Sequence, residues 1–139
     1  MPIDAPSENR PVVVVLDANA SVRSAAQAAL RSLPARVLGY ASAAEFLAAL
    51  DEGLSPACLI ADVALPDLPA VALLGELKAR DRRIPTILLS GDSEIAGTVD
   101  AMRAGAITCI EKPYLARFLL AQVAPLIDDA QAGARRPGG

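Results

Sequence analysis

Five short apolar runs alternate along this chain with longer segments in which apolar residues recur every three or four positions. Each run is 4 to 6 residues long and is bounded by turn-forming residues. Strands that are covered on both faces read as nearly continuous apolar runs, whereas helices show a period of about 3.6 residues. Regular alternation of the two is typical of strand–helix units around a parallel sheet. The predicted strands are Pro11–Leu16, Arg36–Tyr40, Ala57–Ala61, Pro85–Leu89 and Ile107–Ile110.

Each predicted strand is followed by a segment with the apolar spacing of a helix. Pro34 stops the first helix, because proline cannot continue one. Ser42-x-x-Glu45 opens the second as a capping box, which satisfies two free backbone amides. The predicted helices lie over residues 22–33, 42–52, 69–77, 93–103 and 114–127. The sequence therefore predicts an α/β fold with a doubly wound, five-stranded parallel sheet.

The apolar positions of the last three helices predict which side chains face the core. The third helix is expected to bury Val71, Leu74 and Leu77. The fifth has five apolar side chains available for burial, which are Leu115, Phe118, Leu119, Val123 and Leu126. The fourth is less apolar and carries Ile95, Val99 and Met102 on one side. We expect its other side to be free for a partner.

The two ends of the chain lack these patterns. Residues 1–10 and 129–139 are expected to be tails on either side of one domain over residues 11–128. A chain of 139 residues suits a single domain with one compact core. The longest uninterrupted apolar run, Val12–Leu16, is far shorter than the ~18–20 residues needed to span a bilayer. We therefore expect a cytoplasmic protein that does not contact a membrane.

Composition excludes several classes of function. The formal net charge of -3, with no long run of Lys or Arg, disfavours nucleic acid as a direct partner. The chain has no His, which excludes a Ser/His/Asp triad, a Cys/His dyad and a His-based zinc site. Cys58 and Cys109 lie in apolar runs, so we expect buried, inert thiols. The loop over residues 17–21 contains no Gly, which argues against a nucleotide binder or flavodoxin-like enzyme.

Polar side chains follow four of the five predicted strands. Asp17 follows the first strand, Asp62 the third, Ser90 the fourth, and Lys112 comes shortly after the fifth. Singly, each is compatible with an ordinary strand boundary. Because the carboxyl ends of parallel strands meet at one edge of a sheet, where such folds bind ligands, we expect the four side chains to converge there.

The chain resembles the receiver domain of two-component response regulators over about Val12 to Ile127. The matching stretches are Val14-Val15-Leu16-Asp17, Leu59-Ile60-Ala61-Asp62 with Leu65-Pro66, Leu88-Leu89-Ser90-Gly91, Ala101-Met102-Arg103-Ala104-Gly105-Ala106 and Glu111-Lys112-Pro113-Tyr114. Their order and spacing make the resemblance specific. It implies the flavodoxin-like (βα)5 receiver fold with strand order 2-1-3-4-5.

The resemblance also implies a function for the residues at the strand ends. Asp62 would accept a phosphoryl group from a histidine kinase or a phosphotransfer protein, as carboxylates do in other covalent intermediates. Lys112 would neutralise the phosphoryl oxygens and Ser90 would hydrogen-bond one of them. Mg²⁺ would be bound by Asp17, Asp62 and the backbone carbonyl of Ala64. By the same resemblance, the peptide bond before Pro113 would be cis.

Three positions depart from the family pattern, namely Ala18, Cys109 and Asp67. The family has two adjacent acids after the first strand, but here Ala18 follows Asp17, and loss of one charge would weaken Mg²⁺ binding by roughly tenfold to a thousandfold. Asn19 could offer an amide oxygen instead, although the N-cap of the first helix is its expected role. Cys109 replaces an aromatic switch residue and is too small to repeat its motion. Asp67 is expected to add negative charge near the site.

Two functions remain open. The leading hypothesis is a stand-alone receiver, not an enzyme, that is phosphorylated on Asp62 and regulates a downstream protein. The alternative is a pseudo-receiver in which Ala18 has removed the metal-dependent chemistry. It would bind a protein partner, or form a homodimer, through the face made by the fourth helix, the fifth strand and the fifth helix, independently of phosphate.

Overall fold

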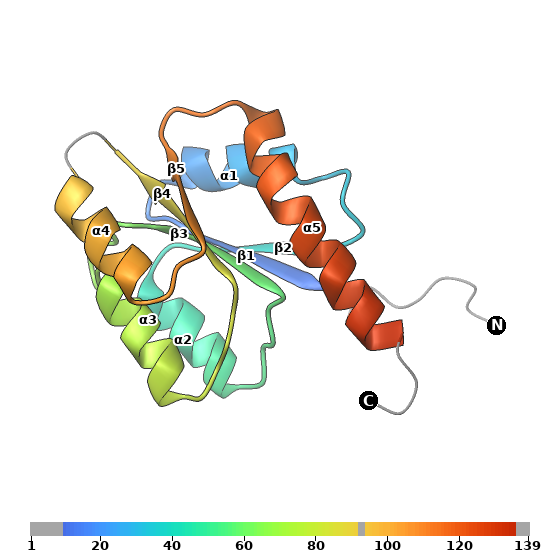
Figure 1. Ribbon diagram of the computed structural model, residues 1–139, viewed down its shortest axis with the longest axis horizontal. Coiled ribbons are helices and arrows are strands. Elements are labelled where there is room, and N and C mark those ends of the chain that lie inside the picture. The colour runs from blue at the N-terminus through green and yellow to red at the C-terminus, as the bar shows by residue number, and fades with distance from the viewer. Residues whose placement is uncertain (1–9, 92–93, 136–139) are drawn as a thin grey trace.

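The computed structural model describes residues 10–91 and 94–135, and it confirms the predicted α/β fold with five parallel strands (Figure 1). The strands stand in the order β2-β1-β3-β4-β5. Every strand pair is parallel, as the predicted winding requires. The elements are β1 (Val12–Leu16), α1 (Ala20–Ala29), β2 (Arg36–Tyr40), α2 (Ala43–Asp51), β3 (Cys58–Asp62), α3 (Ala70–Ala79), β4 (Thr86–Ser90), α4 (Ile95–Arg103), β5 (Thr108–Glu111) and α5 (Ala116–Arg135).

The sheet separates two hydrophobic layers. Helices α1 and α5 lie together on one face, and α2 and α3 cover the other (Figure 1). Alternate residues of a strand point to opposite faces, so Val13 and Val15 of β1 pack toward α1 and α5 while Val14 and Leu16 pack toward α2 and α3. Double coverage explains why β1 and β4 are buried at every position. Strands β1 and β4, which lead to Asp17 and Ser90, are therefore held from both sides.

The two cysteines have different surroundings. Cys58 at the start of β3 is completely buried, and this burial raises the pKa of its thiol to about 12. The prediction of a buried thiol is therefore confirmed for Cys58. Cys109 in β5 is only partly buried. Its thiol lies beside the hydroxyl of Ser90 in the neighbouring strand β4.

Helix α1 begins two residues before the predicted range and ends at Ala29, before Pro34 is reached. The side-chain oxygen of Asn19 accepts hydrogen bonds from the backbone N–H groups of Ser21 and Val22, at 2.8 and 3.4 Å. This geometry is that of an N-cap, which satisfies amides that have no partner inside the helix. The expected role of Asn19 is confirmed, and its oxygen is already engaged.

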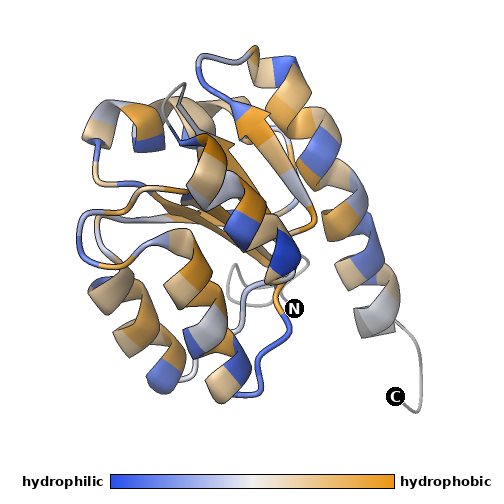
Figure 2. Ribbon diagram, turned by 60° about the vertical axis from the view of Figure 1, so that its left-hand side comes forward, coloured by the Kyte–Doolittle hydropathy of each residue, from blue (hydrophilic) through white to orange (hydrophobic). Residues whose placement is uncertain are grey.

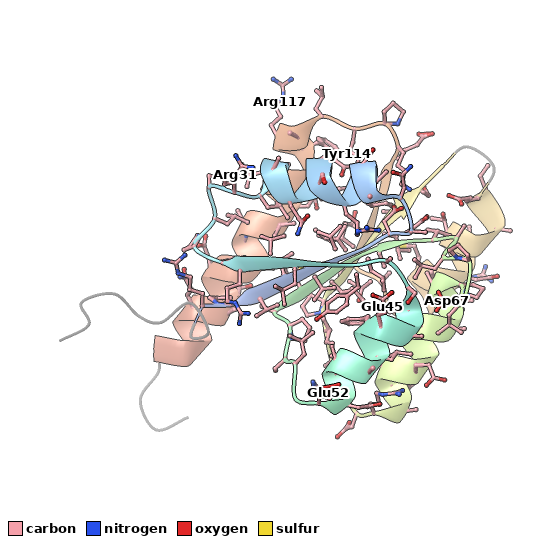
Figure 3. The ribbon with its side chains drawn as sticks, turned by 180° about the vertical axis from the view of Figure 1, so that it is seen from behind. Arg31, Glu45, Glu52, Asp67, Tyr114 and Arg117 are labelled. Carbon is pink, nitrogen blue, oxygen red and sulfur yellow. The ribbon has the colours of Figure 1, made fainter. Side chains whose placement is uncertain are left out.

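Helix α2 has a more elaborate start than the sequence predicted. The Glu45 N–H donates to the Ser42 hydroxyl at 3.2 Å, but the Glu45 carboxylate accepts from that hydroxyl and not from a backbone amide. The amides of Ala43 and Ala44 instead donate to the two carboxylate oxygens of Asp67, at 3.1 and 3.0 Å. Figure 3 shows Glu45 and Asp67 near this end of α2. The capping box is therefore only half formed, and Asp67 caps two other amides of the first turn.

Helix α5 continues to Arg135, past the predicted helix end at Ile127. The prediction ended the helix at its last apolar residue. The residues that follow include the good helix formers Ala130, Gln131 and Ala132, and α5 continues although no apolar residue in 128–133 is buried. Pro125 lies within the helix and does not end it.

Several side chains that were expected to be buried in helices face outward. Val71, Leu115 and Phe118 are exposed to 39%, 61% and 56%, and on α3 it is Leu73 that points into the core. On α4 only Ala101 is buried. The side of α4 that is free for a partner is therefore its apolar side, which carries Ile95, Val99 and Met102. Among the described residues, no helix combines the length and apolar character needed to cross a membrane.

Candidate functional site at the carboxyl ends of the strands

Lys112 links two carboxylates at the carboxyl edge of the sheet. Its ammonium nitrogen lies 3.0 Å from Oδ2 of Asp17 and 3.7 Å from Oδ1 of Asp62. Asp17 follows β1, Asp62 ends β3 and Lys112 follows β5, so three strands contribute to the cluster. Ser90 ends β4, between β3 and β5 in the sheet, and its carbonyl accepts from the Lys112 N–H at 2.8 Å. All four side chains predicted to converge lie at this edge.

Asp17 is held more tightly than the other acid. Its side chain is only 2% exposed. One carboxylate oxygen accepts from the Asn19 N–H at 2.9 Å and the other from Lys112 at 3.0 Å. The guanidinium of Arg23 donates to the backbone carbonyl of Asp17 at 2.7 Å. A buried charge needs such partners, because removing a carboxylate from water is strongly unfavourable otherwise.

Asp62 has fewer partners. Its side chain is 13% exposed, and Oδ1 accepts from the Ala64 N–H at 3.1 Å. Burial raises the pKa of Asp62; the Ala64 amide and the Lys112 charge counteract this, while Asp17 and Glu94 add to it. The balance is a raised pKa. Asp62 is therefore a partly solvated carboxylate with one oxygen free of hydrogen bonds among the described residues, which suits a nucleophile.

Lys112 stays a cation in these surroundings. Burial works to lower the pKa of Lys112, but the hydrogen bond to Asp17 and the charges of Asp62 and Asp17 raise it overall. The Lys112–Pro113 peptide bond is cis, as the resemblance implied. A permanent positive charge beside Asp62 can stabilise negative charge that develops on a bound group.

Glu94 is a third acid near the site that the sequence reading missed. It follows Ser90 by four residues and precedes α4, and its carboxylate accepts from the Gly91 N–H. Its charge acts on both Asp62 and Lys112. The sequence signal that could have identified Glu94 is an acidic residue just before a predicted helix, in the loop that follows Ser90. Its hydrogen bond ties it to its own loop.

The site offers only a small number of oxygen ligands to a hard divalent cation such as Mg²⁺. Asp17, Asp62 and the carbonyl of Ala64 are the groups expected to bind Mg²⁺, and one or two carboxylates plus water form a usual Mg²⁺ site. Ala18 provides no ligand, and the Asn19 oxygen is used by the helix cap. In residues 10–91 and 94–135, no group of three or more His, Cys, Asp or Glu side chains is placed to bind a metal.

Asp67 does not add negative charge to this site, contrary to expectation. Both of its carboxylate oxygens are engaged by the amides of Ala43 and Ala44 at the start of α2. These hydrogen bonds lower the pKa of Asp67, and the bond from Ala44 has the largest effect. Slight burial of Asp67 opposes this lowering. Asp67 thus connects the loop after β3 to α2.

A hollow of about 270 Å³ lies beside Ser90 where β5 carries Cys109. The Cys109 thiol donates to the Ser90 hydroxyl at 3.2 Å. The lining residues are Ser90, Gly91, Ile95, Thr98, Val99, Cys109 and Glu111. Cys109 leaves this space open because its side chain is small. Ile95 and Val99, from the exposed apolar side of α4, form part of its wall.

The strand order and the edge cluster together define a receiver-type domain. A family profile of the response regulator receiver domain matches residues 13–124. The chain therefore belongs to the response regulator receiver domain family.

Named relatives agree with this assignment. The transcriptional regulatory protein FixJ of Bradyrhizobium diazoefficiens is 32% identical over 123 residues, which are 88% of this chain and 60% of that protein. The response regulator protein TmoT of Ectopseudomonas mendocina is 31% identical over 117 residues, which are 84% of this chain and 53% of that protein. The chain thus spans little more than half the length of these relatives.

Solved structures give the same picture. A response regulator receiver protein from Pseudoalteromonas atlantica has a TM-score of 0.76 and 30% identity, over 86% of this chain and 99% of that one. Full-length FixJ from B. japonicum has a TM-score of 0.80 and 31% identity, over 90% of this chain and 61% of that one. As a family, receivers accept phosphoryl groups in two-component signalling, bind Mg²⁺ at an acidic pocket and interact with histidine kinases or phosphotransfer proteins.

Proposed function

We propose that this chain is a phosphoacceptor whose nucleophile is Asp62, and that phosphorylation changes its affinity for a downstream protein. The observation that carries the proposal is Lys112, which lies within 3.7 Å of Asp62 while it is hydrogen-bonded to Asp17. This arrangement pairs a partly solvated nucleophile with a fixed positive charge. The phosphodonor would be a histidine kinase or a phosphotransfer protein.

The proposed reaction forms an acyl phosphate. An oxygen of Asp62 attacks phosphorus, the bond from phosphorus to the donor nitrogen or oxygen breaks, and the leaving atom keeps the electron pair and takes up a proton. Lys112 neutralises charge on the transferring oxygens, and the Ser90 hydroxyl donates to one of them. The domain thus acts as a substrate of signalling and not as a turnover enzyme.

Mg²⁺ is the cofactor that we propose for this step, bound by Asp17, Asp62 and the Ala64 carbonyl. It supplies charge neutralisation on the phosphoryl oxygens when bound. Ala18 leaves the site with one acid fewer than the family pattern, so we expect weaker binding. The hydrogen bonds of Asn19 to Ser21 and Val22 remove the nearest substitute ligand.

Intact-mass spectrometry with acetyl phosphate and Mg²⁺ tests the proposal. The wild type should gain one phosphoryl group, and Asp62→Ala should gain none. Asp128→Ala changes an exposed acid on α5 and serves as the matched control, which should be labelled like the wild type. Absence of labelling in the wild type, under conditions that label an ordinary receiver, would refute the phosphoacceptor function.

The alternative is a pseudo-receiver that binds its partner without phosphorylation. Two observations favour it, namely the missing acid at Ala18 and the exposed apolar side chains on α4 and at the start of α5. Ile95, Leu115 and Phe118 are each more than half exposed, which is unusual for side chains of this size. A partner, or a second copy of the chain, would cover the α4–β5–α5 face in this case.

Partner binding distinguishes the two functions. If phosphate controls the α4–β5–α5 face, Asp62→Ala should abolish any effect of acetyl phosphate on self-association measured by analytical ultracentrifugation. If the domain is a pseudo-receiver, Phe118→Ser should weaken association while Asp62→Ala has no effect. Phe118 is 56% exposed, so its replacement should leave the fold intact.

A further inference from the structure

A groove of about 570 Å³ lies at the amino ends of the strands, at the other end of the sheet from Asp62. It is bounded by the end of α3, the loop from α3 to β4, the loop from α4 to β5, and α5. None of the residues that line it belongs to the phosphoacceptor site. The groove is therefore a separate surface of the domain.

The floor of the groove is apolar. Leu74, Ile84 and Leu126 are partly buried there, and Ile107 is 50% exposed just before β5. Exposed branched side chains next to a concave apolar surface are typical of a binding surface. The floor is large enough for several apolar side chains of a partner and too large for a simple anion.

The rim of the groove is basic. Lys78, Arg82 and Arg83 line it with a single acid, Asp81, and none of the three cations has an ion pair among the described residues. The Arg82 guanidinium donates to the Leu54 carbonyl, which fixes its orientation. Figure 2 shows the connection between α3 and β4 as a hydrophilic segment.

This positive rim stands out against the rest of the molecule. The chain has a formal net charge of -3, whereas three cations and one acid line the groove. The neighbouring Arg80 differs from the rim cations, because it is paired with Asp51 at 2.9 Å and with Glu76 at 2.7 Å. Positively charged side chains without ion pairs, placed around an apolar floor, attract a negatively charged partner.

We propose that this groove binds an acidic amphipathic helix of a partner protein. The apolar face of such a helix would cover Ile84, Ile107 and Leu126, and its Glu or Asp side chains would lie against the basic rim. Nucleic acid fits less well, because it would leave the apolar floor uncovered and would meet a molecule of net negative charge. The proposal is independent of phosphorylation at Asp62.

Two synthetic amphipathic helical peptides with the same leucine stripe test the proposal, one with Glu and the other with Lys on its polar face. Methyl NMR of the full chain should show the Glu peptide shifting the signals of Ile84, Ile107 and Leu126. The Lys peptide should leave them unchanged. Arg83→Glu should weaken binding of the Glu peptide by at least about tenfold.

Two control variants and one disrupting variant sharpen the result. Arg31→Glu reverses an exposed cation just after α1 that does not line the groove (Figure 3), and this variant should bind the Glu peptide as the wild type does. Asp62→Ala should also bind it normally, which separates this surface from the phosphoacceptor site. Ile107→Asp should abolish binding.

Four outcomes would overturn the proposal. They are equal binding of the two peptides, equal effects of Arg83→Glu and Arg31→Glu, shifts confined to residues outside the groove, and no binding of the Glu peptide at millimolar concentration. Duplex DNA that shifted the groove signals in place of the Glu peptide would assign the groove to nucleic acid instead.

Discussion

Lys112 and Asp17 form an ion pair in which the Lys112 Nζ lies 3.0 Å from Oδ2 of Asp17. The Asp17 carboxylate is almost fully buried. Residues 95 positions apart in the chain thus meet at the edge of the sheet. Removing one partner from such a pair leaves a buried charge without compensation, which is more damaging than loss of an exposed salt bridge.

We predict that Lys112→Met destabilises the fold by about 1–3 kcal/mol, below the range for fully buried pairs because Lys112 is partly exposed. Denaturant unfolding measures the change. The double variant Lys112→Met with Asp17→Asn should recover much of the loss, since both charges are then absent. Equal stabilities of the single and double variants would show that the Asp17 charge is not the cause.

Asp62→Asn should stabilise the protein at neutral pH. The raised pKa means that the folded state binds the Asp62 proton more tightly than the unfolded chain does. Asp62 therefore contributes stability below the ordinary pKa of 3.8, and this contribution is lost as the pH rises through the higher folded value.

Thermal unfolding of wild type and Asp62→Asn across the acid range measures this effect. The gain from the Asn variant should be present at pH 7 and should disappear once the pH falls below 3.8. A gain that does not depend on pH would point to packing and not to the charge. Glu52→Gln, which neutralises an exposed acid on the turn after α2 (Figure 3), is the matched control and should show no comparable gain.

Ala18→Asp should tighten Mg²⁺ binding by about tenfold or more, because it restores a second carboxylate beside Asp17. Isothermal titration calorimetry measures the affinity directly. An unchanged titration would show that another group already compensates. Glu94→Gln would then be the informative variant, since Glu94 is the remaining acid whose charge acts on Asp62.

Asp67→Ala should destabilise α2 by about 1 kcal/mol, the usual effect of losing an N-cap. Hydrogen exchange at Ala43 and Ala44 should speed up, because their amides donate to Asp67. The lowered pKa of Asp67 adds stability above its unfolded value, and that stability is lost as the pH falls through the folded value. Phosphoryl uptake on Asp62 should be unchanged, since Asp67 lies outside the site.

The two thiols should react very differently with a maleimide. Cys109 is partly exposed and should be modified in the folded protein. Cys58 is fully buried with a pKa of about 12, so it should react only after unfolding. Peptide mapping after labelling in native buffer and in denaturant distinguishes the sites. Native labelling of Cys58 would contradict the described core.

The strands and their polar ends could be predicted from the sequence because each depends on local pattern. Burial on both faces makes β1 and β4 apolar throughout most of their length, and parallel strands bring Asp17, Asp62 and Lys112 to one edge whatever the loops do. The predicted strand bounds agree with the structure within one residue.

Features that depend on distant partners were not predictable in this way. Asp67 caps amides 23 and 24 residues earlier in the chain, and no local pattern indicates that pairing. The outward side of α4 depends on which helix face packs on the sheet, and there the small Ala101 is buried instead of the larger apolar residues. Glu94 was missed because its effect on Asp62 depends on how the loop after β4 folds.

Strand β4 places two surfaces of this molecule at a fixed separation. Pro85 lines the basic groove and Ser90 lies at the phosphoacceptor edge, with only buried residues between them. Five residues of strand span roughly 17 Å and bend little when they are packed on both faces. A protein bound in the groove would therefore be held at a constant distance from a kinase engaged at Asp62, so the domain could act as a rigid spacer between two proteins.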